Sequence, residues 1–208
     1  MSTTTRHRPW LFRSIFAATG VAMTILASIP PARADRLPSE LRGIDGRPVA
    51  TRAEVGGATV LTAYSTECPI SNAIVPALKS IAEGPDAGRV RFIGLCVDPD
   101  LGDPAVADHA REFGLPFPVV RDRDGAIASG LGLKVTPEVV LIDGQGRTRY
   151  RGRVDDQFVT RRVRNAHPGT HELRDAIAAV LGGREVAKPH VEAVGCPLPT
   201  PSKPAKPG

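Results

Sequence analysis

Cysteine is scarce in this chain of 208 residues, which has only Cys68, Cys96 and Cys196. An odd number excludes a fully paired disulfide framework, because at most one internal bridge can form and one thiol is left over. Cys96 lies in the segment 89–97, whose apolar second half predicts a buried central strand, so we expect this cysteine to serve packing only. Cys68 and Cys196 remain as the candidates for chemistry.

A hydrophobic run long enough to span a bilayer is also missing. The chain opens with Arg6, Arg8 and Arg13, continues with an apolar stretch over 14–29, and then has the Ala-x-Ala pattern of a cleavage site at 32–34. These features predict a signal peptide over 1–34 and an exported, periplasmic protein. The alternative is an uncleaved anchor, but the stretch is shorter than the ~20 residues that a spanning helix needs. No cysteine follows the cleavage site, so a lipid anchor is not indicated.

A strong excess of one charge is missing once this leader is set aside. The 27 basic residues outnumber the 22 acidic ones, but residues 1–34 hold four of the arginines and no acid. The remaining chain is nearly neutral, so the basic composition predicts no nucleic-acid partner. Cleavage also removes the apolar stretch over 14–29, so no stable membrane insertion is expected afterwards.

The order of predicted elements indicates a single α/β domain. Residues 35–187 form the predicted domain, and residues 188–208 form a tail rich in proline and lysine that we expect to be flexible. No internal repeat is present. Strands are predicted over 58–64, 91–97, 138–142 and 148–152, helices after Cys68 and over 105–113, 126–131 and 171–181, and an outlying hairpin over 41–50. Two β-α units, a hairpin and a helix predict a central mixed β-sheet flanked by helices on both faces.

The segment around Cys68 carries the clearest chemical signal. An apolar strand ends at Tyr64, a polar turn follows, and Pro69 suits the first position of the next helix. Cys68 is therefore expected at a helix N-terminus, where free N–H groups and the helix dipole favour a negatively charged, nucleophilic sulfur. A small buried cysteine with a packing role is the alternative.

Four features in order resemble the thioredoxin superfamily, in its branch of exported redoxin-domain proteins grouped with the alkyl hydroperoxide reductases. Cys68, Ser71 and Pro76 have the spacing of the Cys-x-x-Cys motif and its helix proline, with serine in place of the second cysteine. The other three features are Val-Thr-Pro-Glu at 135–138, the segment 150–157, and Gly-Cys-Pro at 195–197. The resemblance implies a thioredoxin-like fold and a thiol-disulfide oxidoreductase.

The resemblance also implies roles for particular residues. Cys68 would be the nucleophile, and Thr136 and Pro137 would form a cis-proline turn that faces it and pairs with an extended substrate. The Ser71 hydroxyl either hydrogen-bonds the Cys68 thiolate or caps the helix. We hypothesise that Cys196, delivered by the flexible tail, forms a disulfide with Cys68 and resolves it, although an unpaired or intermolecular thiol is the alternative.

Other functions remain open at this point. A peroxiredoxin-like peroxidase would share the Cys-Pro helix start and Ser65, but this chain has Leu61 and Thr136 where that family has a proline and an arginine. A copper-binding module could use Cys68 and Cys196 with His171 or His190. A non-catalytic binding module of the same fold is a further alternative. The expected partners are protein thiols or disulfides, or a peroxide, with a thioredoxin-like electron donor; no organic cofactor and no metal are expected.

Alternating arginines at 147, 149, 151 and 153 share one face of a predicted strand. Such a row protects a solvated sheet edge from aggregation. Recognition of an anionic partner is the alternative interpretation.

Overall fold

The computed structural model describes residues 37–198 together with Met1, and the following account is limited to them. Four helices are present in this part: α1 (Pro69–Ala82), α2 (Asp103–Glu112), α3 (Ala126–Gly130) and α4 (Glu172–Leu181). The strands are β1 (Glu40–Arg42), β2 (Pro48–Ala50), β3 (Ala58–Tyr64), β4 (Val90–Cys96), β5 (Val119–Arg121), β6 (Val135–Thr136), β7 (Glu138–Asp143), β8 (Thr148–Gly152), β9 (Phe158–Thr160), β10 (Val163–Arg164), β11 (His190–Val191) and β12 (Cys196–Pro197).

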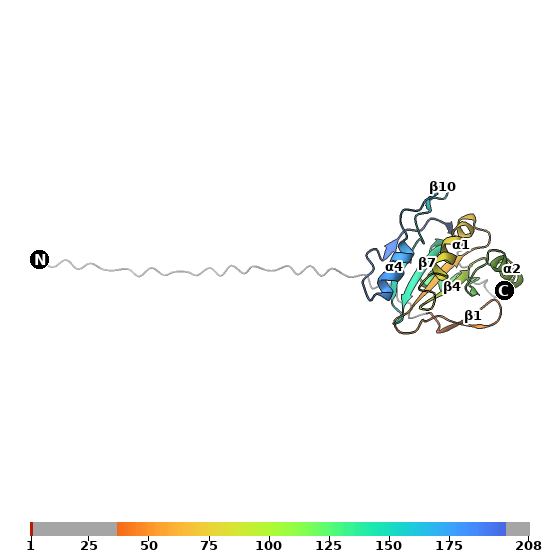
Figure 1. Ribbon diagram of the computed structural model, residues 1–208, viewed down its shortest axis with the longest axis horizontal. Helices are drawn as coiled ribbons and strands as arrows, with labels where there is room; N and C mark the ends of the chain where they lie inside the picture. The colour runs from red at the N-terminus through yellow and green to blue at the C-terminus, as the bar shows by residue number, and fades with distance from the viewer. Residues whose placement is uncertain (2–36, 199–208) are drawn as a thin grey trace.

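A six-stranded mixed sheet forms the centre, in the order β11-β8-β7-β3-β4-β5. β3, β4 and β5 run parallel to one another, whereas β7 runs antiparallel to both β3 and β8. β3 is buried at every position because both of its faces are covered, which explains why its sequence is mostly apolar, with only Thr59 and Thr62 as small polar residues. Figure 1 shows α4, α1 and α2 from left to right in the view, and the β9–β10 hairpin at the upper end of the molecule.

Two apolar clusters cover the two faces of the sheet. On one face α1 and α4 pack against alternate residues of β3, β4 and β7, with Ile74, Leu78 and Leu173 at the centre. On the other face α3, the loop around Leu131 and Leu133, and the β1–β2 hairpin cover the remaining positions. The predicted mixed sheet with helices on both faces is therefore confirmed, as is the outlying hairpin over 41–50.

The sequence did not predict the short strands β5, β6 and β9 to β12. Two of these belong to the segment 188–198, which we expected to be flexible. That expectation is wrong for these residues, because β11 adds in parallel to the open edge of β8 and β12 pairs with β6. Backbone hydrogen bonds hold this segment together with the packing of Val191 and Leu198 against the two apolar clusters, and composition does not reveal these long-range contacts.

The predicted signal peptide lies, apart from Met1, outside the described residues, as does the chain beyond 198. Within the described part, no helix combines the length and apolar character needed to cross a membrane.

Asp143 organises the turn between β7 and β8. Its carboxylate is almost fully buried and accepts hydrogen bonds from the N–H groups of Gln145 and Arg147 and from the guanidinium groups of Arg147 and Arg149. Burial alone would raise the pKa of Asp143, but these donors and the nearby positive charges lower it below its ordinary value of 3.8. The ionised carboxylate therefore stabilises the fold.

We expect Asp143→Asn to lower the free energy of unfolding by about 2 kcal/mol at neutral pH, because it removes charge-assisted hydrogen bonds from a buried site. Since the pKa is depressed in the folded state, this stabilisation is present above the unfolded value and is lost as pH falls through the folded value. Urea titrations at neutral and acidic pH should show the difference from wild type shrinking in acid. Asp45→Asn is the matched control, since Asp45 caps a similar Asp-Gly turn but is exposed.

Candidate functional site

Cys68 occupies the N-cap of α1, directly before Pro69. Its backbone is extended, with φ −87° and ψ 114°, so the thiol lies where the polar turn after β3 becomes a helix. The side chain is only 3% exposed, and its Sγ lies 3.3 Å from the Thr136 carbonyl oxygen, to which the thiol donates. The expected position at a helix start is thus found, but the sulfur is covered rather than open.

The turn that faces Cys68 contains a cis peptide bond between Thr136 and Pro137, as expected. Thr136 is buried and belongs to β6, next to the sulfur of Cys68. The buried carboxylate of Glu138 fixes this turn, because it accepts hydrogen bonds from the backbone N–H groups of Lys134 at 2.7 Å and Val135 at 3.3 Å. Arg151 lies 3.7 Å from the same carboxylate and balances its charge.

Ser71 is buried one turn into α1, but within the described residues its hydroxyl does not make the expected contact with Cys68. It accepts a hydrogen bond from the Ser65 N–H at 3.3 Å and lies 3.3 Å from the hydroxyl oxygen of Thr136. Thr136 also reaches the Ala63 carbonyl oxygen at 3.3 Å. Ser71 therefore joins α1, β3 and the cis-proline turn, and it is neither a cap nor a direct partner of the sulfur.

Cys196 lies next to Cys68, although a strand and not a flexible tail brings it there. β12 pairs antiparallel with β6, so that Cys196 lies opposite Thr136 and Pro197 opposite Val135. The Leu198 N–H extends the pairing with a 3.0 Å hydrogen bond to the Lys134 carbonyl oxygen. Cys68 and Cys196 are consequently free thiols that lie near each other, close enough for Cys68 to raise the pKa of Cys196.

The surroundings of Cys196 make its thiol weakly acidic. Burial, followed by the interaction with Cys68 and the negative charge that Cys68 can carry, raises the pKa of Cys196 to about 11, while the positive charge of Arg161 opposes this. Cys196 is therefore protonated at neutral pH. A protonated thiol is a poor nucleophile, so Cys68, at the start of α1, is the better candidate for the attacking sulfur.

Asp98 fixes the polar turn that leads into Cys68, and the sequence analysis missed it. One of its carboxylate oxygens accepts hydrogen bonds from the Thr66 N–H at 2.7 Å and the Thr66 hydroxyl at 2.9 Å. Asn72 holds the same turn from α1 through the Thr66 carbonyl oxygen at 2.9 Å. A position just after β4 could have indicated Asp98, because the carboxyl ends of parallel strands meet at one edge of the sheet.

Cys96 has the packing role that the sequence predicted. It is fully buried in β4, and burial in particular raises the pKa of its thiol to about 11. Its sulfur lies 3.3 Å from a guanidinium nitrogen of Arg121 and 3.7 Å from the Asp98 carboxylate. A protonated and inaccessible thiol is a poor nucleophile, so Cys96 is separate from the Cys68–Cys196 pair.

The alternating arginines do not form a free anion-binding site, because each has an acidic partner within the domain. Arg147 and Arg149 pair with Asp143, and Arg151 pairs with Glu138. Arg153 donates to Glu172 through its Nε at 3.0 Å. The positive charges of the row are therefore neutralised within the domain. The sequence suggested a solvated sheet edge or an anion-binding site, and neither interpretation included these ion pairs.

The ligand set suggested for copper is not brought together. His171 is the N-cap residue of α4, and His190 lies on β11 with a ring nitrogen 3.0 Å from the Arg151 carbonyl oxygen. In the part of the chain that the structure describes, no three His, Cys, Asp or Glu side chains are grouped as metal ligands.

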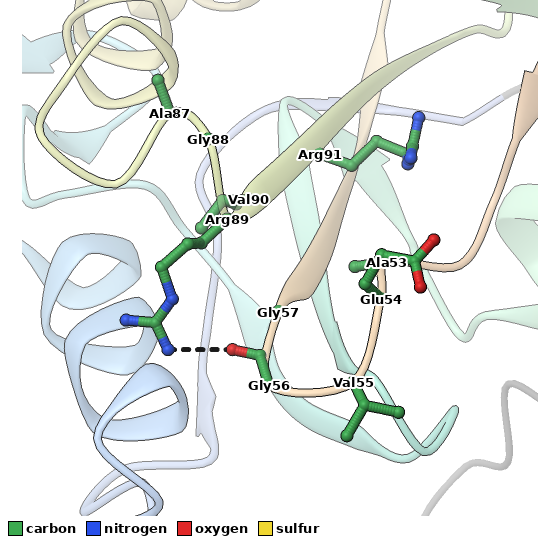
Figure 2. Close-up of a pocket in the computed structure, with 10 residues that line it drawn as sticks. All are labelled: Ala53, Glu54, Val55, Gly56, Gly57, Ala87, Gly88, Arg89, Val90 and Arg91. Carbon is green, nitrogen blue, oxygen red and sulfur yellow. Dashed lines mark hydrogen bonds between the residues drawn. The ribbon is translucent and has the colours of Figure 1, made fainter.

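A surface hollow of about 400 Å³ lies away from the thiol pair, where the chain enters β3 and β4 (Figure 2). Figure 2 shows the guanidinium of Arg89 donating to the Gly56 carbonyl oxygen, at 2.9 Å, beside the exposed Val55. Cys68 follows the opposite, carboxyl end of β3. The hollow therefore takes no part in the candidate site.

A thiol at a helix N-terminus, opposite a cis-proline turn and beside a mixed sheet, defines a thioredoxin-superfamily protein. A family model described as Redoxin matches residues 31–166, and the chain belongs to the Redoxin family. It is accordingly an oxidoreductase of the thiol-disulfide class.

Individual proteins resemble the chain in sequence or in fold. The chain is 28% identical over 132 residues to the soluble secreted antigen MPT53 of Mycobacterium tuberculosis, a match covering 62% of this chain and 74% of that protein. An uncharacterized conserved protein from Geobacillus kaustophilus has a similar structure, with a TM-score of 0.69, 25% identity, and coverage of 83% of this chain and 92% of that one. The exposed lipoprotein thioredoxin Etrx1 of Streptococcus pneumoniae shares the fold at a TM-score of 0.50 and 20% identity, over 69% of this chain and 97% of that one.

Proposed function

We propose that this protein is an exported thiol-disulfide oxidoreductase in which Cys68 attacks and Cys196 resolves. The observation that carries the proposal is the place of both thiols at the cis-proline turn: the Cys68 Sγ lies 3.3 Å from the Thr136 carbonyl oxygen, and the pairing of β12 with β6 puts Cys196 opposite Thr136. The predicted leader over 1–34 and the secreted relative support export, and the periplasm is the compartment we propose.

The proposed reaction has two exchange steps. The Cys68 thiolate attacks one sulfur of a substrate disulfide, that S–S bond breaks, and a mixed disulfide with Cys68 forms while the leaving sulfur takes up a proton. Cys196 then gives up its proton to the departing substrate sulfur and attacks Cys68. The substrate leaves with two electrons and two protons as a dithiol, and the protein retains a Cys68–Cys196 disulfide.

The remaining residues position this pair in the proposed mechanism. Ser71 and Thr136 tie α1 to the cis-proline turn, and Pro137 sets the direction in which β6 presents its backbone. A thioredoxin-like donor would return the two electrons, and the same steps run backwards would oxidise a substrate dithiol. No residue has to hold an organic cofactor in this scheme.

The proposal predicts a single internal disulfide. Mild oxidation of the purified mature protein should convert two of its three thiols into one bridge, because Cys68 and Cys196 both lie beside Thr136 and Cys96 is buried apart from them. Non-reducing peptide mapping should recover a peptide that links Cys68 to Cys196, with Cys96 unmodified. A Cys68 peptide that is never linked to Cys196 would contradict the proposed resolving role. Turnover of hydrogen peroxide, without exchange on a protein disulfide, would favour the peroxidase alternative.

A further inference from the structure

The β9–β10 hairpin is the most exposed basic and apolar surface near the thiol pair. Residues 158–164 contain Arg161, Arg162 and Arg164 and no acidic residue, and all three arginines are exposed. Val159 is 61% exposed and Val163 52% exposed, which is unusual for large aliphatic side chains in the described part of this protein. The hairpin is separate from the central sheet, and Figure 1 shows it at the upper end of the molecule.

Nothing within the described residues neutralises these arginines. None of the three forms an ion pair there, in contrast to the arginines of β8. The nearest acids in the sequence are used elsewhere: Asp155 is buried and accepts from the Gln157 N–H at 3.0 Å, and Asp156 accepts from the Gly169 N–H at 2.8 Å. The hairpin therefore presents a positive charge that is available to an external anionic partner.

The base of the hairpin is attached to the candidate site. Phe158 lines a small cleft together with Ile74 of α1, Pro137 of the cis-proline turn and Val194, two residues before Cys196. The Gln157 side chain donates to the Ala73 carbonyl oxygen of α1 at 3.2 Å. Arg161 is close enough to Cys196 for its charge to lower the pKa of that thiol, against the larger effects of burial and Cys68. The hairpin therefore lies beside the thiol pair.

We propose that the β9–β10 hairpin is a docking surface for an acidic polypeptide segment that flanks the reactive cysteine of the substrate. This inference rests on the proposed function and names the class of substrate for the same site. The arginines would pair with carboxylates of the segment, and Val159 and Val163 would lose exposed apolar surface on contact. Each strand of the hairpin also has an unpaired edge in the described structure, which an extended segment can join by backbone hydrogen bonds.

The test compares two peptides that carry a central cysteine as a mixed disulfide with 2-mercaptoethanol. One has glutamates on both sides of the cysteine, and the other has glutamines at the same positions. We expect the reduced protein to react about tenfold faster with the acidic peptide at low ionic strength, and the preference to disappear near ~0.5 M salt. For each protein variant, both peptide rates are divided by its rate on neutral bis(2-hydroxyethyl) disulfide. This corrects for differences between variants in the reactivity of the protein thiol.

The matched variants reverse the same number of charges at two places. R161E/R162E/R164E should abolish or invert the preference for the acidic peptide. R47E/R52E/R91E, which alters exposed arginines outside the hairpin, should keep it. If both variants lost the preference for the acidic peptide equally, the preference would depend on net charge alone and the proposal would be overturned. Equal wild-type rates on the two peptides would also overturn it. Reaction with the small disulfide but no acidic preference refutes the docking surface alone, whereas no reaction with any disulfide refutes the proposed function.

Vesicles with anionic lipids separate this proposal from a membrane role. We expect the wild type and R161E/R162E/R164E to remain equally in the supernatant when such vesicles are sedimented at physiological ionic strength. Sedimentation of the wild type that the hairpin variant loses would overturn the assignment of a polypeptide partner and favour a lipid surface.

Discussion

Cys68→Ser is expected to reduce thiol-disulfide exchange by at least about a thousandfold, because a serine hydroxyl is not ionised near neutral pH and cannot replace the attacking thiolate. The substitution changes one atom at the N-cap of α1, and serine is itself a good N-cap residue, so the fold should persist. The rate of reduction of a small disulfide, followed by the absorbance of the released thiol, measures the loss.

Cys96→Ala is the control for this prediction. Cys96 is buried in β4, apart from the pair, so its replacement should leave the exchange rate unchanged even if the protein becomes slightly less stable. Circular dichroism of both variants verifies that they are folded. If Cys68→Ser retained full exchange activity, the assignment of Cys68 as the nucleophile would have to be abandoned.

Gly195→Val should separate Cys196 from Cys68 without removing either thiol. A Cβ atom at Gly195 would lie 2.7 Å from the Thr136 carbonyl carbon and 3.2 Å from the Pro137 nitrogen, and both belong to backbone that cannot easily move. We therefore expect β12 to leave β6, and the yield of the Cys68–Cys196 disulfide to fall about tenfold or more. Mixed disulfides between Cys68 and substrate should accumulate, as in Cys196→Ser. Non-reducing gels and mass spectrometry measure both species.

The control for Gly195→Val is Gly88→Val. No atom lies within 4 Å of the place that a Cβ would take at Gly88, so this change adds the same side chain without a clash. It should leave the disulfide yield at the wild-type level. A wild-type yield in Gly195→Val would show that Cys196 reaches Cys68 without the β12–β6 pairing, which contradicts the proposed geometry.

The strong local signals of the sequence were sufficient for the central fold. The apolar run of β3 and the Pro69 helix start are decided by short-range chemistry, and both appear at the expected positions. The cis-proline turn at Thr136 and Pro137 was different: only the resemblance indicated it, since a proline by itself favours the trans bond.

Long-range pairings were beyond the reach of composition and periodicity. β12 is two residues long and contains a proline, so no periodic pattern marks it, and its place depends on the free backbone groups of β6. The role of Ser71 was misjudged for a similar reason, because its partners Ser65 and Thr136 come from other segments. Cys196 was selected correctly as a neighbour of Cys68, although a fixed strand and not a mobile tail places it there.

The same segment that supplies Cys196 first forms β11 along the outer edge of β8. An uncovered edge strand is a template for pairing with another molecule, so β11 protects this domain from self-association. Proteolytic cleavage between α4 and β11 would release both strands together. The protein would then lose the Cys196 thiol and expose the unpaired edge of β8 at the same time. Loss of activity and aggregation would therefore occur together.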